Sequence, residues 1–172
     1  TASFGQGVAY TPIGITRALS TLANDGILIR PHVVSEFKYT GLPSKEINTE
    51  EQGKVLKQST SRRISTMLTE VVDDALLDGT VALPQYSIAA KTGTAQIPAP
   101  DGGYYEDRFL HSFFGYFPSY DPEFLVFLYI VKPVGARYAS QTLTEPFMDI
   151  TEFLLNYYEI PPDRQELAGP AL

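Results

Sequence analysis

The sequence contains no cysteine and no tryptophan, and it has only two histidines and two methionines. A chain without cysteine forms no disulfide and no thiolate metal site, although this does not decide between an oxidising and a reducing compartment. Its longest apolar run, residues 124–131, is far shorter than the ~20 residues that span a bilayer, and no leader-like segment opens the chain. We therefore expect no membrane segment in this chain, with any membrane anchor lying outside it.

Positive charge is also scarce, since 13 basic residues stand against 20 acidic ones and give a net charge of −7. Lysine and arginine do not cluster into a stripe that could neutralise a phosphate backbone, so nucleic acid is not an expected partner. The two histidines, His32 and His111, are far apart and have no third ligand nearby in the sequence, which indicates structural roles. We expect no metal and no cofactor.

What is present is a rich apolar composition, with 44% hydrophobic and 12% aromatic residues in 172 positions. That length suits one domain with a real core. The first residue is Thr1 and not methionine, so we interpret the chain as a fragment of a longer protein.

The helix signals are clear in two places. Thr11 and Pro12 form an N-cap and a first helical position, and apolar residues then recur at helical spacing until Asn24-Asp25-Gly26, which predicts the helix end. Residues 61–78 carry a complete i, i+3, i+4, i+7 apolar series and form the strongest predicted helix. Residues 27–39 are expected to be extended, and residues 40–54 to be polar loop.

The second half predicts a sheet. Residues 86–95 form one expected strand, and residues 111–117 and 124–132 form a hairpin around a turn with two prolines. The second hairpin strand is apolar without alternation, so we expect helices on both faces of the sheet. Pro146 is expected to open a last helix, and the chain from residue 160 to 172 is expected to be a loose tail.

One motif carries chemistry: Lys91-Thr92-Gly93-Thr94, inside "SIAAKTGTAQIP". The lysine supplies a fixed positive charge, two threonine hydroxyls supply hydrogen bonds to an anion, and glycine lets a substrate lie against the backbone. On an edge strand, a free backbone N–H could also stabilise an oxyanion. The motif predicts a strand that grips a carboxylate beside a reacting carbonyl.

The surrounding sequence resembles the C-terminal half of the transpeptidase domain of class B penicillin-binding proteins over nearly its whole length. The resemblance is carried, in order, by these segments: "SFGQGVAYTP", "LANDGILIRPHVV", "LLDGTVALPQYSIAAKTGTAQ", "HSFFGYFP", "IVKP" and "EPFMDITEFLL". One departure is visible, because the family usually has glycine before the lysine and this chain has Ala90. The resemblance implies an α+β, penicillin-recognising fold of the serine transpeptidase and β-lactamase kind, with an antiparallel sheet flanked by helices, of which residues 1–159 form the C-terminal part.

The family's roles transfer to the matching positions as expectations. Lys91 would organise the site and help hold the carboxylate of a D-alanyl-D-alanine stem peptide or of a β-lactam, and Thr92 and Thr94 would bind the same carboxylate. The N–H of Thr94 would be one oxyanion donor, while Gly93, Ala95 and Gln96 complete the substrate strand, a β-addition mode of binding.

The resemblance also implies two motifs that this chain does not supply, a Ser-x-x-Lys nucleophile and a Ser-x-Asn loop. No Ser-x-Asn occurs in the sequence. The one Ser-x-x-Lys string, from Ser35 to Lys38, falls in a predicted strand, where residues three apart point to opposite faces, so we reject it as the nucleophile. The expected nucleophile is therefore not in this chain.

Two other pairs have ordinary explanations. Asp73 and Asp74 lie near the end of a helix and are expected to be solvated rather than to bind a metal. Tyr104 and Tyr105 fall in the long loop after the motif strand, where both substrate contact and ordinary loop packing remain open.

We therefore interpret the chain as part of a peptidoglycan D,D-transpeptidase that works on the extracytoplasmic (periplasmic) face of a bacterial membrane and is inactive alone. The alternatives are a penicillin-binding sensor or non-catalytic homologue, and a serine β-lactamase or D,D-carboxypeptidase of the same fold. The expected partners are the stem peptide, β-lactams and the missing N-terminal half of the domain. Without that half, exposed apolar surface predicts self-association.

Overall fold

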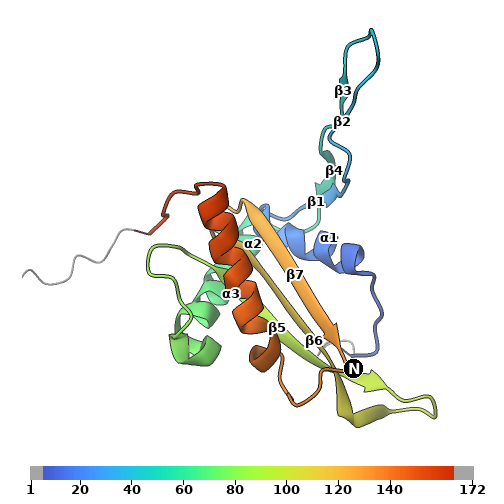
Figure 1. The fold of residues 1–172 in the computed structure, drawn as a ribbon, viewed down its shortest axis with the longest axis vertical. Helices are drawn as coiled ribbons and strands as arrows, with labels where there is room; N and C mark the ends of the chain where they lie inside the picture. Colours follow the sequence, from blue (N-terminus) through green and yellow to red (C-terminus); the bar gives the residue numbers. More distant parts are fainter. Residues whose placement is uncertain (1–5, 165–172) are drawn as a thin grey trace, which may run out of the picture.

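A computed structural model describes residues 6–164. Within them, the main sheet is antiparallel with strand order β5-β6-β7, and its strands are β5 (Ala89–Pro98), β6 (Tyr104–Phe117) and β7 (Phe124–Val131). Three α-helices accompany it: α1 (Pro12–Ala23), α2 (Gln58–Glu70) and α3 (Ser140–Tyr157). Figure 1 shows α3 lying across the sheet and a narrow arm projecting beyond α1. The expected α+β architecture is confirmed.

The first helix forms where its local signals predict. The Thr11 side chain accepts a hydrogen bond from the Gly14 N–H at 3.1 Å, and Pro12 occupies the first turn. After the C-cap at Asn24, Gly26 adopts a left-handed φ of +85°, and a Cβ at this position would lie 2.2 Å from the Leu56 carbonyl oxygen. Glycine is therefore required there for conformation and for space.

Helices pack on both faces of the sheet, as the apolar hairpin predicts, although every residue of β7 stays half-buried or exposed. On one face, Phe147 of α3 stacks on Phe113 with ring centroids 4.4 Å apart and meets Phe117 edge-on. On the other face, the Tyr116 hydroxyl lies 2.8 Å from the Ser65 hydroxyl of α2. A continuous core joins β5, β6 and α3 to the segment at residues 72–76 and is made by these buried residues: Val72, Leu76, Ile88, Ala90, Phe113, Phe117, Leu143, Phe147, Met148 and Leu155.

The predicted loop over residues 40–54 is wrong. Strand β4 (Glu50–Lys54) pairs antiparallel with β1 (Ile27–Arg30), and β2 (Glu36–Phe37) pairs with β3 (Lys45–Glu46) to form the arm. Every residue of β4 is exposed. Because such a ribbon buries neither face, its sequence lacks the apolar alternation that signals a strand.

Several predicted boundaries also shift. The helix expected over residues 61–78 begins at Gln58 and changes after Glu70 into a π-helical turn (Val71–Ala75) and a 3₁₀ turn (Leu76–Gly79). The motif strand begins at Ala89 rather than at residue 86, and β6 begins at Tyr104 rather than at residue 111. Helix α3 starts at Ser140, so Pro146 lies inside it and not at its start.

Residues 160, 163 and 164 are bonded to the rest of the fold, although a loose tail was expected from residue 160. The Tyr86 hydroxyl donates to the Ile160 carbonyl oxygen at 3.0 Å, the Ser87 N–H donates to Asp163 at 2.7 Å, and Arg164 forms a bidentate ion pair with Asp73. The expected loose tail therefore does not begin at residue 160. Residues 165–172, like residues 3–5 of the expected entry loop, lie outside the described residues. No helix within residues 6–164 has the length and apolarity to cross a membrane.

Candidate functional site

The motif occupies the middle of β5, and its side chains alternate between the two faces of the sheet. In the β5–β6 register Thr92 pairs with Phe113 and Thr94 with His111. Directly paired residues share a face, and Phe113 packs on α3, so Thr92 and Thr94 lie on the α3 side. Lys91 lies with Gly93 on the opposite side, toward α1. A carboxylate held by Lys91 and both threonines would therefore lie along the edge of the strand.

That edge is open, because β5 pairs only with β6 within residues 6–164. The Lys91 ammonium donates to the Thr92 carbonyl oxygen at 2.9 Å, whereas the Ser112 hydroxyl of β6 lies 3.5 Å from the Gly93 carbonyl oxygen. The polar backbone groups of successive residues in a strand point to opposite sides. Thr92 and, by the two-residue period, Thr94 therefore turn their N–H and C=O groups toward the open edge.

The Thr94 hydroxyl has a fixed partner at the start of α3. Thr94 is exposed, and its Oγ1 accepts a hydrogen bond from the Ala139 N–H at 3.0 Å. An oxygen that accepts from a backbone N–H still has its own hydrogen to donate. Thr94 can therefore present an O–H donor to an anion at the strand edge.

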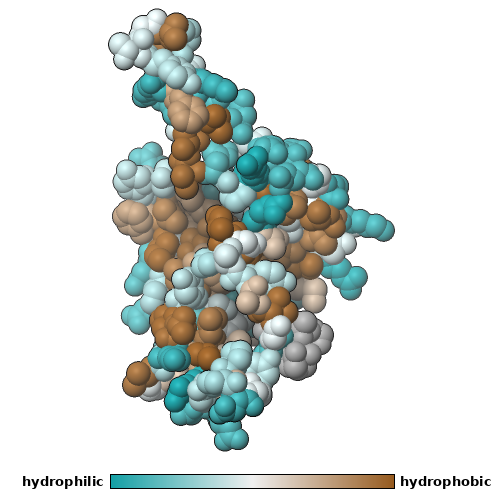
Figure 2. Space-filling view, turned by 90° about the vertical axis from the view of Figure 1, so that its right-hand side faces the viewer, coloured by the Kyte–Doolittle hydropathy of each residue, from teal (hydrophilic) through white to brown (hydrophobic). Residues whose placement is uncertain are grey.

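A groove of about 640 Å³ lies beside the motif, on the α1 side of the sheet. Its lining is mostly apolar and includes Lys91 and Gly93 together with these residues: Val8, Tyr10, Ile15, Leu19, Leu110, Phe114, Phe127 and Tyr129. Figure 2 shows hydrophobic side chains gathered over the middle of this side of the molecule, below the arm. The motif thus borders a hollow that is apolar on its walls and charged at its edge.

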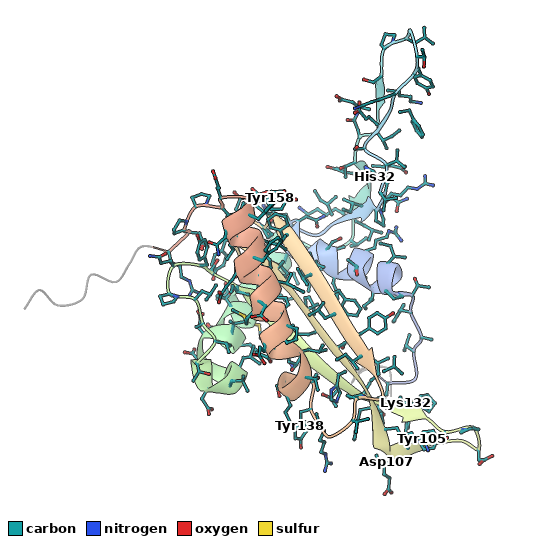
Figure 3. All side chains as sticks on the ribbon, in the orientation of Figure 1. His32, Tyr105, Asp107, Lys132, Tyr138 and Tyr158 are labelled. Carbon is teal, nitrogen blue, oxygen red and sulfur yellow. The ribbon has the colours of Figure 1, made fainter. Side chains whose placement is uncertain are left out.

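The end of the motif strand leads into a hairpin. The Gln96 side chain donates to the Tyr105 carbonyl oxygen at 3.1 Å, and the Arg108 guanidinium lies 4.0 Å from the centre of the Tyr105 ring. Tyr104 and Tyr105 open β6 rather than a loop. Figure 3 shows Tyr105 at the sheet end that also holds Lys132 and Tyr138.

The rejected candidates lie apart from this site. Lys38 forms an ion pair with Glu36 at 2.8 Å on the arm, and His32 lies at the base of the arm and is exposed. Asp73, expected to be solvated, is instead bonded to Arg164, a long-range partner that sequence spacing does not reveal. Within residues 6–164, no three His, Asp or Glu side chains gather closely enough to hold a metal ion.

The site described so far brings one lysine charge, a threonine hydroxyl and outward backbone groups to an open strand edge, and comparison with known proteins gives the family of the chain. The model of the penicillin-binding protein transpeptidase domain matches residues 1–152. The chain belongs to this family. The predicted resemblance is confirmed.

Among curated proteins, the chain is 32% identical over 173 residues to a peptidoglycan D,D-transpeptidase FtsI homolog from Mesostigma viride, covering 93% of this chain and 29% of that protein. It is 32% identical over 155 residues to stage V sporulation protein D of Bacillus subtilis, covering 86% of this chain and 23% of that protein. The chain thus spans less than a third of the length of these curated relatives.

Solved structures show the same fold. Penicillin-binding protein 3 from Mycobacterium tuberculosis, in complex with ampicillin, aligns with a TM-score of 0.79 at 24% identity, covering 96% of this chain and 38% of that one. The transpeptidase domain of penicillin-binding protein 3 from Burkholderia pseudomallei aligns with a TM-score of 0.70 at 25% identity, covering 96% of this chain and 47% of that one. The penicillin-recognising fold is therefore shown for this chain.

Proposed function

We propose that this chain supplies the substrate-binding strand of a peptidoglycan D,D-transpeptidase. The observation that carries the proposal is the open edge of β5, where the Lys91 charge, the Thr94 hydroxyl and the outward backbone groups of Thr92 and Thr94 converge beside an apolar groove. Relatives named as D,D-transpeptidases support the reaction class.

In the proposed reaction, a serine hydroxyl attacks the carbonyl carbon of the penultimate D-alanine, the peptide C–N bond breaks, and the terminal D-alanine leaves with a proton on its amine. An amine of a second stem peptide then attacks the acyl-enzyme ester and releases the serine. The serine and its base come from outside this chain, which has no Ser-x-Asn and no helical Ser-x-x-Lys.

The residues of β5 act in binding and in charge stabilisation. Lys91 and the hydroxyls of Thr92 and Thr94 hold the terminal carboxylate, and charge-assisted hydrogen bonds of this kind are the strong ones. The Thr94 N–H donates to the oxyanion, and Gly93, Ala95 and Gln96 line the acyl portion of the substrate. A Cβ on Gly93 would approach only the rotatable Ser112 hydroxyl, at 2.5 Å, so packing within the sheet does not by itself demand glycine there.

The proposal also includes the binding partners of the protein and its location in the cell. Substrates are the D-alanyl-D-alanine stem peptide and β-lactams, and the groove beside Lys91 receives the other half of the transpeptidase domain. The intact protein acts outside the cytoplasm, anchored by sequence outside this chain. Without the other half, the exposed apolar residues of this groove favour self-association, which light scattering measures.

The test is acylation by a fluorescent penicillin, read by intact mass spectrometry. The chain alone is expected to form no covalent adduct. A separate polypeptide that carries the family's Ser-x-x-Lys and Ser-x-Asn motifs is then mixed with it, and an adduct is expected on that polypeptide only when both are present. A stoichiometric adduct on any serine of this chain would contradict the proposal, as would equal acylation of the second polypeptide without this chain.

A further inference from the structure

The register places His111 of β6 directly opposite Thr94 of the motif. His111 is fully buried, yet both ring nitrogens have partners. Its Nε2 lies 3.0 Å from the Arg137 carbonyl oxygen and its Nδ1 lies 2.9 Å from Thr142 Oγ1. Because a carbonyl oxygen can only accept, Nε2 carries a proton and donates to Arg137.

These two bonds hold both ends of the turn that leads into α3. Arg137 lies before the turn and Thr142 lies in the first turn of the helix. Between them, the Gln141 side chain accepts from the N–H groups of Arg137 and Tyr138 at 3.1 and 3.0 Å. The turn is therefore held by the His111 ring, which belongs to β6, and by the side-chain amide of Gln141, which belongs to α3.

Ala139 lies at the centre of this turn. It is fully buried, and its N–H donates to Thr94 Oγ1 at 3.0 Å. The Thr142 hydroxyl also lies 3.3 Å from the Ala139 carbonyl oxygen. Thr142 has one hydroxyl hydrogen, so it cannot donate to His111 Nδ1 and to the Ala139 carbonyl oxygen at once. His111 is instead joined to Thr94 through its contacts with Arg137 and Thr142, which hold the turn whose Ala139 N–H donates to Thr94.

The hydrogen bond from the Ala139 N–H to Thr94 Oγ1 decides whether the Thr94 hydroxyl can donate to a ligand. If the Ala139 N–H occupies the acceptor side of the Thr94 oxygen, the hydroxyl hydrogen must point elsewhere, and Thr94 is an exposed residue at an open strand edge. An O–H donor fixed in this way suits an anionic acceptor such as a carboxylate. If the turn moved, the hydroxyl would be free to rotate and to present its lone pairs instead.

We infer that His111 is a positioning residue, which fixes the turn before α3 and thereby sets Thr94 as a hydrogen-bond donor to the carboxylate of the stem peptide or β-lactam. This inference rests on the proposed function of the motif strand. His111 does not touch the substrate, and its effect passes through Ala139.

The first test reads the hydrogen-bond set in the chain itself and does not depend on catalysis. Amide hydrogen exchange at Ala139, followed by NMR, is expected to become at least about tenfold faster in Thr94→Val and in His111→Leu, since an amide that loses its acceptor loses protection. His111→Gln keeps an N–H that can donate to Arg137 and is expected to restore most of the protection. Unchanged exchange at Ala139 in folded His111→Leu would overturn the inference.

The second test is a double-mutant cycle on the acylation rate with a β-lactam, in the assembly of this chain with the polypeptide that carries the nucleophile. Thr94→Val and His111→Leu are each expected to slow acylation about tenfold, the effect of one hydrogen bond to a charged group. In the Thr94→Val background, His111→Leu is expected to cause no further loss. Additive losses would mean that His111 supports the fold in general, and would overturn the inference.

Thr142→Val and Thr144→Val give a matched pair in case His111→Leu fails to fold. Both threonines belong to the first half of α3, but only Thr142 contacts His111. Thr142→Val is expected to slow acylation and Thr144→Val to leave the rate within about twofold. Equal rates for the two would overturn the inference. An unmodified assembly that never acylates would refute the proposed function instead, and Ala139 exchange would then decide the hydrogen-bond set alone.

Discussion

Ala90 and Gly115 face each other across β5 and β6 so closely that a Cβ on Gly115 would lie 2.8 Å from that of Ala90. The same added atom would lie 2.4 Å from the tip of the Phe147 ring and 2.9 Å from the Ala89 carbonyl oxygen. Ala90 is fully buried in the core. The family usually has glycine before the lysine, where this chain has Ala90. The extra methyl group of Ala90 fits because Gly115, directly opposite, has no side chain.

Gly115→Ala is expected to lower the free energy of unfolding by about 1–3 kcal/mol. The added methyl group would overlap both the Phe147 ring and the Ala89 carbonyl group, and relieving both overlaps requires the core to shift. Gly93→Ala is the matched control in the neighbouring strand, since its new methyl would meet only the rotatable hydroxyl of Ser112. Urea unfolding of the two variants measures the difference. Equal losses would mean that the contact around Phe147 is not tight.

The residue pair Ser87 and Asp163 predicts a second stability effect. Both the Ser87 N–H and its hydroxyl donate to the Asp163 carboxylate, and Ser87 is buried. Asp163→Asn keeps the shape but replaces one acceptor oxygen by an NH₂ group, so a buried donor loses its partner. The expected cost is about 1–3 kcal/mol.

Asp149→Asn, on the exposed face of α3, is the control for that change and is expected to alter stability by less than about 0.5 kcal/mol. Thermal unfolding compares the two variants, and exchange of the Ser87 amide reports the local loss. If Asp163→Asn were as stable as the unmodified chain, the contacts of residues 160–164 would not contribute to the fold.

This contact also explains why residues 160–164 do not belong to the predicted loose tail. Helix α1 could be predicted because its cap, its first-turn proline and its glycine are all local to it. Asp163 and Ser87 are 76 residues apart, and nothing in either neighbourhood specifies the other. From sequence alone, a proline-rich chain end is therefore predicted to be loose, because its bonding partner lies far away in the sequence.

The candidate site divides in the same way. The motif could be located on an edge strand from the residues at 91–94 because each has a chemical reason to be there. The hydrogen bonds of His111 could not, since a lone histidine in an apolar strand has the same sequence pattern whether it packs passively or orients a neighbour. Residues 27–39 were correctly predicted to be extended, but their partner strands β3 and β4 were missed, because charged ribbons lack the periodicity on which strand prediction depends.

Tyr116 predicts a loss of stability at alkaline pH. Burial raises the pKa of this phenol above its ordinary value of 10.0, and the nearby Tyr120 adds to the rise, while the hydrogen bond with Ser65 opposes it. The folded state therefore keeps a proton that the unfolded state loses. The resulting stabilisation is fully present below pH 10 and is lost as the pH rises through the pKa of the folded state.

Tyr116→Phe is expected to flatten the fall in unfolding free energy above pH 10, relative to the unmodified chain. Ser65 keeps a partner in the variant, because its hydroxyl also donates to the Ser61 carbonyl oxygen at 3.2 Å. Tyr129→Phe removes the hydroxyl of a residue that is 49% exposed and serves as the matched control. Parallel pH curves for the unmodified chain and Tyr116→Phe would show that burial does not hold the phenol proton.

The two lysines of the competing motifs predict opposite results in the assembled enzyme. Lys91 borders the groove and has its ammonium at the open edge of β5, where a charge-assisted hydrogen bond to a carboxylate is worth about 1.5–3 kcal/mol. Lys91→Ala is therefore expected to slow β-lactam acylation by about tenfold or more. Lys38 is paired with Glu36 on the arm, so Lys38→Ala is expected to leave the rate within about twofold.

Stopped-flow acylation of the chain together with the polypeptide that supplies the nucleophile compares the two variants directly. Circular dichroism of each variant is the control, since neither side chain is part of the core and both variants are expected to fold. Because the two substitutions remove the same chemical group from exposed positions, any difference between them must come from location. Equal rates for Lys91→Ala and the unmodified chain, or a large loss for Lys38→Ala, would mean that the carboxylate is held elsewhere than at the edge of β5.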